Sequence, residues 1–289
     1  MGSISMKIAP DWTAAFKEAV RIKTIGFIGA GKCGMSLAYY FRSKGINVRG
    51  FSSRSNDIED FELFSCDELV KASDIIFITV TDTAIPEVWE SISGMDLEGK
   101  IICNCSGSLS SEIFSGANHD MVCSVHPMLA FNSRHTSIDA VEQAFFTVEG
   151  GKYAVSSVSE ILSLCNNKFR IINARDKAKY HAASCFASNF VVAVCDKAVR
   201  LLSECGFNET EARDALAPLM RNNMENIISC GAAGAITGPA ARRDFVTIER
   251  HMDALDEKTA ALYSALTDVI LNETTAKRRD GNEKDNIIF

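Results

Sequence analysis

The stretch TIGFIGAGKCGMSLAYYFRSKG (Thr24–Gly45) joins a short apolar run to a segment with the spacing of an amphipathic helix, and it places three glycines at the junction. Gly29, Gly31 and Gly34 have the spacing G-x-G-x-x-G. Each glycine costs backbone entropy, so a cluster on one turn indicates a sharp bend or a close approach to the backbone. This predicted strand, turn and helix set the pattern for the first half of the chain.

Strand-like and helix-like segments alternate as far as residue 173. The run DIIFITV is apolar almost throughout, which is typical of a strand buried on both faces of a parallel sheet. Alternation of this kind predicts an α/β fold with a doubly wound sheet of the Rossmann type. The predicted strands cover residues 24–29, 46–53, 74–80, 100–106, 121–127, 144–150 and 169–174.

From residue 176 onward the sequence contains only helix-like segments. We therefore expect two domains, an α/β domain of residues 1–173, of which residues 1–20 form an N-terminal extension, and an all-α domain of residues 174–289. A glycine such as Gly206 is typical of a helix end, and Asp244 suits the start of a later helix. Four helices are predicted: the first covers residues 176–206, the second ends near 231, the third begins after 244, and the fourth covers 258–273. A polar tail follows them.

The composition excludes several classes of protein. The 289 residues are 47% hydrophobic and 23% charged, with a formal net charge of −7, and no basic stripe suits nucleic acid or a membrane surface. No apolar run is long enough to span a bilayer, and the first twenty residues lack the apolar segment of a signal peptide. The ten cysteines are scattered without a C-x-x-C pair, so we expect free thiols, no metal site and a cytoplasmic protein.

The glycine turn has the context in which a G-x-G-x-x-G motif binds a dinucleotide, directly after a strand and at the mouth of a helix. There Gly29 permits the tight turn, Gly31 admits a pyrophosphate to the backbone, and Gly34 lets helix and strand pack closely. The anion then rests on free N–H groups at the helix N-terminus, where the helix dipole favours negative charge. The predicted contacts also include the residues between the glycines, Ala30, Lys32 and Cys33.

The end of the second strand distinguishes NAD from NADP. An NAD site carries an acidic residue there for the ribose 2′-hydroxyl, whereas this chain has GFSSRS, with Ser53 and Arg54 and no acid before Asp57. Arginine pairs with a 2′-phosphate and serine donates a hydrogen bond to it. The sequence therefore favours NADP as the cofactor; the alternative is that Arg54 is an exposed loop residue.

The next two strands of the predicted sheet end in residues that suit the ribose and the nicotinamide, because ligands of open α/β sheets lie outside the carboxyl ends of the strands. Each of these residues is equally suited to capping a helix or forming a turn. The candidates are Thr81, Asp82, Ser106 and Gly107.

One face of the long predicted helix carries polar side chains that suit catalysis. Lys177, His181, Ser184 and Ser188 are spaced i, i+4, i+7 and i+11, which places them in one stripe. The stripe faces either solvent or a cleft, and in a cleft Lys177 is a candidate proton donor or electrostatic clamp, while His181 titrates in a useful range. Two further candidates lie off the stripe, His126 at the end of a predicted strand and Asn189 on another helix face.

The chain resembles a family of Rossmann-like NADP oxidoreductases with a helical C-terminal domain of unknown function, in segments that cover nearly all residues after Arg21: GFIGAGKCGMSLAYYF, NCSGSLSSEIF, SVHPMLAF, KAKYHAASCFASNF and ITGPAARRDFVTIERHM. That family is similar to pyrroline-5-carboxylate reductase, the deazaflavin-dependent NADP oxidoreductases and the 6-phosphogluconate dehydrogenase group. The resemblance implies a nucleotide-binding domain, a helical domain used for dimerisation and a substrate cleft between them. It also supports Lys177, His181 and Asn189 as site residues.

We therefore expect an NADP-dependent oxidoreductase that transfers hydride to or from a small carbonyl, imine or hydroxy-acid substrate, and a homodimer formed through the C-terminal helices. Three alternatives stay open: a non-catalytic NADP-binding or redox-sensing protein, an obligate partner subunit, and a prephenate-dehydrogenase-like enzyme. The last rests on the HPM that begins at His126, although the LAF after it departs from that enzyme's glycine-containing continuation. The sequence names no substrate.

Overall fold

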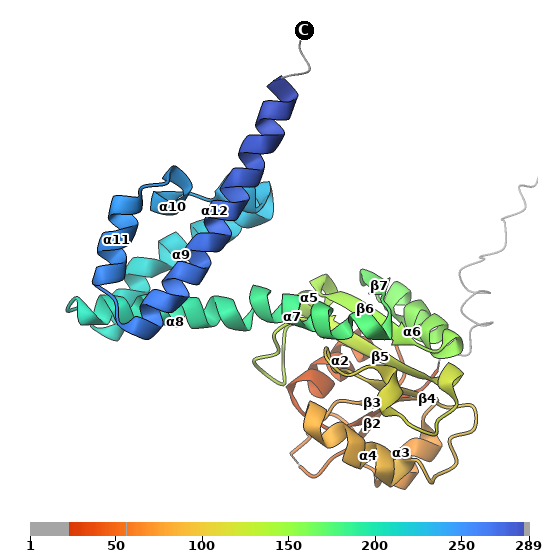
Figure 1. Cartoon of the computed structure of the whole chain (residues 1–289). Helices are drawn as coiled ribbons and strands as arrows, with labels where there is room; N and C mark the ends of the chain where they lie inside the picture. The colour runs from red at the N-terminus through yellow and green to blue at the C-terminus, as the bar shows by residue number, and fades with distance from the viewer. Residues whose placement is uncertain (1–22, 56, 286–289) are drawn as a thin grey trace, which may run out of the picture. The chain divides into compact units, whose positions relative to one another are not determined.

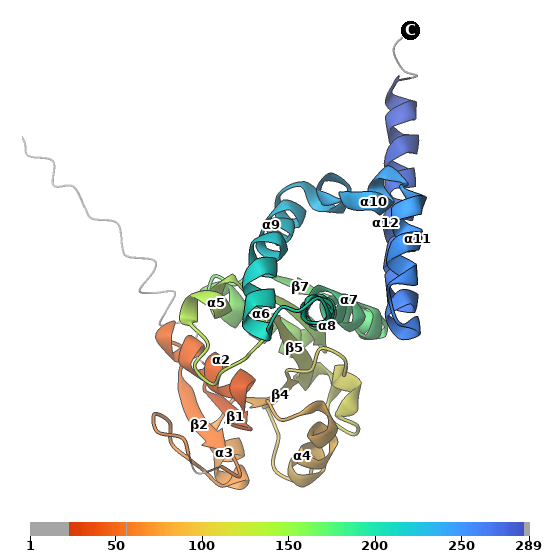
Figure 2. The ribbon, with the colours of Figure 1, turned by 90° about the vertical axis from the view of Figure 1, so that its left-hand side faces the viewer.

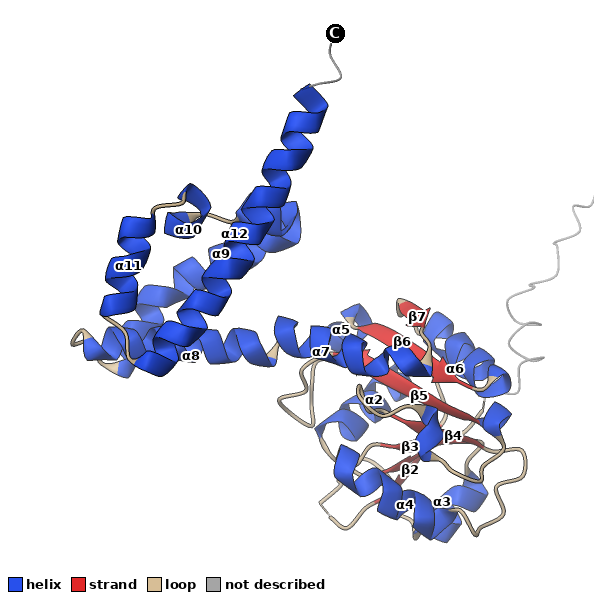
Figure 3. Ribbon diagram, viewed as in Figure 1, coloured by secondary structure: helices blue, strands red, loops and turns tan. Residues whose placement is uncertain are grey.

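A computed structural model describes residues 23–55 and 57–285, an α/β part followed by helices alone (Figure 1, Figure 3). The predicted fold class, a Rossmann-type α/β part followed by an all-α region, is confirmed. The chain divides into two compact units, Met1–Phe190 and Val191–Phe289. The N-terminal extension predicted for residues 1–20 lies outside the described residues.

The first unit is built on one seven-stranded sheet with the order β2-β1-β3-β4-β5-β6-β7. Neighbouring strands are parallel except for the antiparallel pair β5 and β6. The chain order reverses at β1, which has β2 on one side and β3 on the other, and ligands of open α/β sheets bind at such a switch point. The predicted strands are all present: β1 (Ile25–Ile28), β2 (Val48–Ser52), β3 (Ile75–Ile78), β4 (Ile101–Asn104), β5 (Val122–Met128), β6 (Phe145–Gly150) and β7 (Phe169–Ile171).

The α-helices of the first unit are α2 (Lys32–Ser43), α3 (Cys66–Ala72), α4 (Ile85–Ile92), α5 (Ile138–Gln143), α6 (Lys152–Leu164) and α7 (Lys177–Ala187). Short 3-10 helices lie between them: η1 (Asp82–Ala84), η2 (Ser111–Ile113), η3 (His119–Met121) and η4 (Ala174–Asp176). Because successive strand residues point to opposite faces, the sheet has two apolar faces. Phe27 and Phe77 pack with α2, α5 and α6 on one face, whereas Ile28 and Ile78 pack with α3 and α4 on the other. Figure 2 shows these helices around the sheet.

The remaining helices are α8 (Asn189–Glu204), α9 (Glu209–Ala235), α10 (Gly238–Arg242), α11 (Phe245–Asp253) and α12 (Glu257–Asp285). Gly231 interrupts α9 with a φ of 71°, close to the predicted end of that helix. The side chain of Asp244 accepts the N–H of Thr247 and so caps α11, as predicted. α12 continues through the predicted polar tail.

The single helix predicted for residues 176–206 is divided at Ser188, whose φ of −127° and ψ of −81° are not helical. The hydroxyl of Ser188 donates to the carbonyl of Ser184 at 2.8 Å, and bonds of this kind bend helices. α7 belongs to the first unit because its side chains bond to the sheet and the loops beside it. The compact units divide at residues 190/191, and the domain boundary after residue 173 stays a prediction.

The two units bury very different amounts of apolar side chain. The first has apolar clusters on both faces of its sheet. Over residues 191–272, the part of the second unit whose side chains are described, the buried apolar residues are Ala212 and Ala240 alone. In the part of the chain that the structure describes, no helix has the length and apolar content needed to cross a membrane. Large apolar side chains exposed in the second unit include Val192, Leu219, Ile228, Phe245, Val246 and Val269.

Candidate functional site

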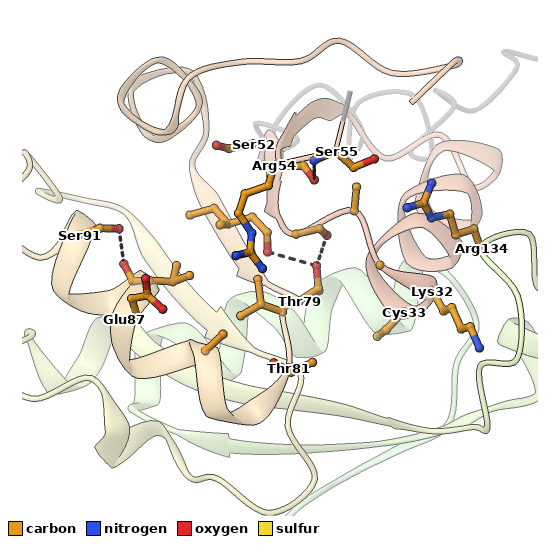
Figure 4. Close-up of a pocket in the computed structure, with 18 residues that line it drawn as sticks. Lys32, Cys33, Ser52, Arg54, Ser55, Thr79, Thr81, Glu87, Ser91 and Arg134 are labelled. Carbon is orange, nitrogen blue, oxygen red and sulfur yellow. Dashed lines mark hydrogen bonds between the residues drawn. The ribbon is translucent and has the colours of Figure 1, made fainter. Parts of the chain in front are cut away.

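A cavity of about 800 Å³ opens at the switch point of the sheet, where the loops after β1, β2 and β3 meet (Figure 4). This volume is within the range of small-molecule and cofactor sites. The cavity is lined by residues 28–33, 52–55 and 79–81, with Ala84, Glu87, Val88, Ser91 and Arg134.

Most of the predicted cofactor residues line this cavity: Gly29, Ala30, Gly31, Lys32, Cys33, Ser53, Arg54 and Thr81. Gly34, Asp82 and Ser106 are not among the lining residues. Gly34 packs behind the turn, and the other two belong to a hydrogen-bond network beside the cavity.

Two of the three motif glycines are required by the packing of the protein itself. Gly29 has a φ of +105°, and a Cβ there would lie 2.8 Å from Val80 Cγ1. A Cβ on Gly34 would collide with the carbonyl oxygen of Gly29 and with Oγ1 of Thr79. Gly31 is different, because a Cβ there would meet nothing closer than the Thr79 carbonyl oxygen at 3.8 Å. Its missing side chain leaves open space in the cavity, as a ligand lying against the backbone requires.

The N-terminus of α2 is open toward the same space. Gly31 is the N-cap residue, no side chain caps the helix, and its first turn contains no acidic residue. The first N–H groups of an α-helix have no partner within the helix. Those of α2, together with the helix dipole, are therefore available to an anion in the cavity.

Positive charge dominates the cavity walls. Lys32, Arg54 and Arg134 line the cavity, against the single carboxylate of Glu87 on α4 (Figure 4). Arg54 is exposed and forms no ion pair with the residues that the structure describes. The lining residues at the end of β2 include no acid.

A hydrogen-bond network extends from the cavity to the end of β4. Thr81 lines the cavity, and the next residue, Asp82, accepts the hydroxyls of Ser106 and Ser108 at 2.8 Å each. The Ser106 hydroxyl in turn accepts the N–H of Ser108 and of Leu109 at 3.1 and 2.9 Å. These bonds fix the loop after β4 against the loop after β3.

Lys177, at the start of α7, is buried beneath this loop with 2% of its surface exposed. Its ammonium donates to the Ser106 carbonyl at 2.9 Å and to the Ser124 hydroxyl at 2.5 Å. Burial disfavours the charged form and lowers the pKa of Lys177 to about 8, although the Glu149 carboxylate opposes the shift. Lys177 therefore contacts protein groups and holds the Ser106 loop in place.

Two imidazoles meet beside the same loop. Nδ1 of His126, on β5, lies 2.7 Å from the Tyr180 hydroxyl, and its ring centroid lies 6.0 Å from that of His181. A Cβ on Gly107 would lie 2.9 Å from His126 Nε2 and would collide with His181 Cδ2, so only glycine fits against both rings. Burial, and then the Lys177 charge, lowers the pKa of His126 to about 4. His126 is therefore neutral at pH 7.

The predicted polar stripe faces the protein rather than solvent. Lys177 is buried, and His181, Ser184 and Ser188 are half-buried. The structure brings Lys177, His181 and His126 together around the Ser106 loop. Asn189 is exposed at the start of α8, beyond the break at Ser188.

Sequence reasoning missed three residues of this region, Tyr180, Ser124 and Arg134. Strand alternation predicts Ser124 and His126 on one face of the sheet, so a closer look at that strand would have found Ser124. Tyr180 lies one position off the polar stripe, and its bond to His126 joins residues 54 positions apart. Arg134 lies in a loop, where no periodic signal marks a side chain.

Comparison with known proteins agrees with this geometry. Residues 24–107 match the family described as NADP oxidoreductase, coenzyme F420-dependent, and residues 144–270 match a domain of unknown function (DUF2520). The protein named "Putative ketol-acid reductoisomerase 3" of Saccharolobus solfataricus is 34% identical over 88 residues. That match covers 29% of this chain and 26% of the relative, so the chain spans about a quarter of that relative's length.

Solved structures share the fold at low sequence identity. Protein TM1727 of Thermotoga maritima is 23% identical, with a TM-score of 0.68 over 88% of this chain and 99% of that one. A Plasmodium falciparum pyrroline carboxylate reductase with NADP bound is 15% identical, with a TM-score of 0.57 over 88% of this chain and 97% of that one. The match of residues 24–107 agrees with the predicted class, an NAD(P)-dependent oxidoreductase, and names no substrate. The N-terminal part of the chain is thus similar to the coenzyme-F420-dependent NADP oxidoreductase family, and the C-terminal part is similar to the DUF2520 family.

Proposed function

We propose that this protein is an NADP-dependent oxidoreductase that transfers hydride to or from a small carbonyl, imine or hydroxy-acid substrate. The observation that carries the proposal is the continuity of the site. An open glycine turn at an uncapped helix leads, through Thr81 and Asp82, to a loop held between Lys177 and two imidazoles. The fold shared with a pyrroline carboxylate reductase supports a substrate with a C=N or C=O bond.

In this proposal the pyrophosphate lies against Gly31 and the first turn of α2, and Ser53 and Arg54 bind the 2′-phosphate. Three observations support it: the open space at Gly31, the excess of positive charge, and the absence of an acid among the lining residues at the end of β2. A guanidinium forms strong charge-assisted bonds with a phosphate. When bound, the coenzyme supplies or accepts the hydride at its nicotinamide ring.

The imidazoles perform the proton chemistry of the proposed reaction. Nδ1 of neutral His126 shares a hydrogen bond with the Tyr180 hydroxyl, and its Nε2 faces the loop at Gly107. Half-buried His181 is open enough to exchange a proton with the reacting oxygen or nitrogen. Lys177 acts as a positioning residue, because its ammonium is already bonded to Ser106 and Ser124.

A screen of metabolites that follows NADPH absorbance tests the proposal. We expect at least one small carbonyl, imine or hydroxy acid to be turned over, and His126→Gln and His181→Gln each to lower kcat by about 100-fold or more. Exposed His119, changed to Gln, is the matched control and keeps full activity. Full activity in both site variants, or NADPH binding without any turnover, contradicts the catalytic assignment.

Calorimetry tests the cofactor assignment separately. We expect tighter binding of NADPH than of NADH, with the preference reduced in Arg54→Ala because that variant removes a phosphate partner. Arg49, which pairs with Glu62 at 3.1 Å outside the cavity, serves as the matched arginine control, and Arg49→Ala should keep the preference. Equal affinities of the wild-type protein for the two coenzymes contradict NADP as the cofactor.

We also propose that two copies associate through the C-terminal unit and that the protein works in the cytoplasm. The scarcity of buried apolar side chains over residues 191–272 supports association, because an exposed apolar surface of this extent is typical of an interface. All ten cysteines are free thiols, which supports a reducing compartment.

A further inference from the structure

The loop between β5 and α5 reaches the cofactor cavity and is held there by α2. The buried hydroxyl of Ser36 accepts the N–H of Thr136 at 3.3 Å and lies 3.3 Å from the carbonyl oxygens of Ser133 and Arg134. The ring of His135 lies against Tyr39 of α2, with centroids 5.0 Å apart. This anchorage gives Arg134 a fixed starting point beside the cavity.

The guanidinium of Arg134 lines the cavity and extends toward the loop after β2. Its Nη1 lies 3.2 Å from the carbonyl oxygen of Asp57 and 3.5 Å from Oδ2 of the same residue. The two side chains are 37% and 83% exposed, and an exposed pair at this distance contributes little. Arg134 is therefore weakly held and remains available to a stronger anion.

The guanidinium of Arg134 lies in a different part of the cavity from the α2 N-terminus, which suits a pyrophosphate. The α2 N-terminus lies at the turn after β1, whereas the Asp57 contact places Arg134 at the loop after β2, which also carries Arg54. That end of a Rossmann cavity receives the 2′ position of the adenosine ribose. A phosphate monoester presents three strong acceptor oxygens and can engage two guanidinium groups at once.

We propose that Arg134 is a specificity-determining residue that binds the coenzyme 2′-phosphate together with Arg54, leaving Asp57 as it does so. This inference rests on the proposed function, because it requires a coenzyme in the cavity. It assigns recognition of the phosphate to two separate elements, the loop after β2 and the loop after β5. Asp57 then acts as a weak internal competitor for the same guanidinium.

Titration calorimetry with NADPH and NADH tests this assignment on the full chain. We expect Arg134→Met to weaken NADPH binding by at least about tenfold while NADH binding changes by less than about twofold. Arg134→Lys keeps the positive charge and should lose less NADPH affinity than Arg134→Met. Asp57→Asn removes the competing carboxylate, although not the carbonyl contact, and strengthens NADPH binding by about twofold. Arg49→Met, outside the cavity, changes neither affinity.

A fragment experiment separates the 2′-phosphate from the rest of the coenzyme. Adenosine 2′,5′-bisphosphate should compete with NADPH on the wild-type protein and lose that ability in Arg134→Met, whereas 5′-AMP should bind equally to both. If Arg134→Met weakens NADPH and NADH alike, the residue only holds the two loops together and the assignment is overturned. If the wild-type protein binds neither coenzyme, the proposed function itself has failed; an NADPH preference unchanged by Arg134→Met defeats this inference alone.

Discussion

The first unit buries its large apolar side chains, and the second leaves most of its own exposed. Phe27 of β1 is fully buried and stacks with Phe41, Phe51 and Phe77, with ring centroids 5.3 to 6.5 Å apart. In the second unit Ile228 of α9 is 85% exposed. Burial of apolar surface is the main favourable term in folding. The first unit therefore holds its own core, whereas the described part of the second lacks one of comparable size.

The two units also differ in the functions that we propose for them. The cavity, the Ser106 loop and the imidazole pair all lie within residues 23–190, on elements fixed by the sheet. A rigid scaffold of this kind holds catalytic groups in place. The second unit exposes many large apolar side chains, and the proposed role of these side chains is association rather than chemistry. The predictions that follow test this division, beginning with the largest effect.

Phe27→Ala tests the core of the first unit. We expect a loss of about 3–5 kcal/mol in the free energy of unfolding, because the change removes a buried ring and leaves a cavity between three other rings. Denaturant unfolding followed by the fluorescence of buried Trp89, in a Trp12→Phe background, reports on this unit. A loss below about 1 kcal/mol would mean that the sheet does not depend on this aromatic cluster.

Lys177 gives the first unit a pH-dependent stability. Its pKa is about 8 in the folded state and near 10.5 when exposed, so the unfolded chain binds more protons between these values. The free energy of unfolding should therefore rise by up to about 3 kcal/mol from pH 8 to 10.5, relative to Lys177→Met. Denaturant unfolding followed by Trp89 fluorescence at several pH values measures this free energy. If it changes with pH in the same way in the wild-type protein and in Lys177→Met, burial does not lower the pKa of Lys177.

Ile228→Asp probes the second unit. A charge at an exposed position costs a monomer little, but within an apolar interface it should weaken dimerisation by at least about tenfold. Light scattering over a range of concentrations measures the effect, and Asp214→Asn on the same helix is a polar control. A wild-type protein that stays monomeric at micromolar concentration, or a dimer unaffected by Ile228→Asp, contradicts assembly through this surface.

The sequence predicted the fold well where local patterns decide it. The seven strands, the glycine turn and the Asp244 cap each follow from apolar runs or short-range spacing. The break at Ser188 was missed because the residues around it all suit a helix; two serine hydroxyls are bonded to carbonyls one turn back at this point. Arg134 and Tyr180 were missed because their roles depend on contacts between distant segments, which no single pattern in the sequence records.

Lys177 in the candidate site shows the same limit of prediction from sequence. The spacing of Lys177 and His181 predicted a shared face correctly, and burial of that face against the Ser106 loop follows from the fold. The sequence could not show that the Lys177 ammonium is already bonded to a carbonyl and a hydroxyl of the protein. Because of that contact, we propose a positioning role for Lys177 in place of the predicted proton donor or electrostatic clamp.

Calorimetric titration of Gly31→Ala with NADPH tests the central claim most directly, because a Cβ at this position meets no protein atom closer than 3.8 Å. We predict an unfolding free energy within about 0.5 kcal/mol of the wild-type value, since nothing in the protein is displaced, and NADPH binding weakened by at least about tenfold, since the methyl group occupies the place of the pyrophosphate. Unchanged NADPH affinity in a normally folded Gly31→Ala protein would contradict the account.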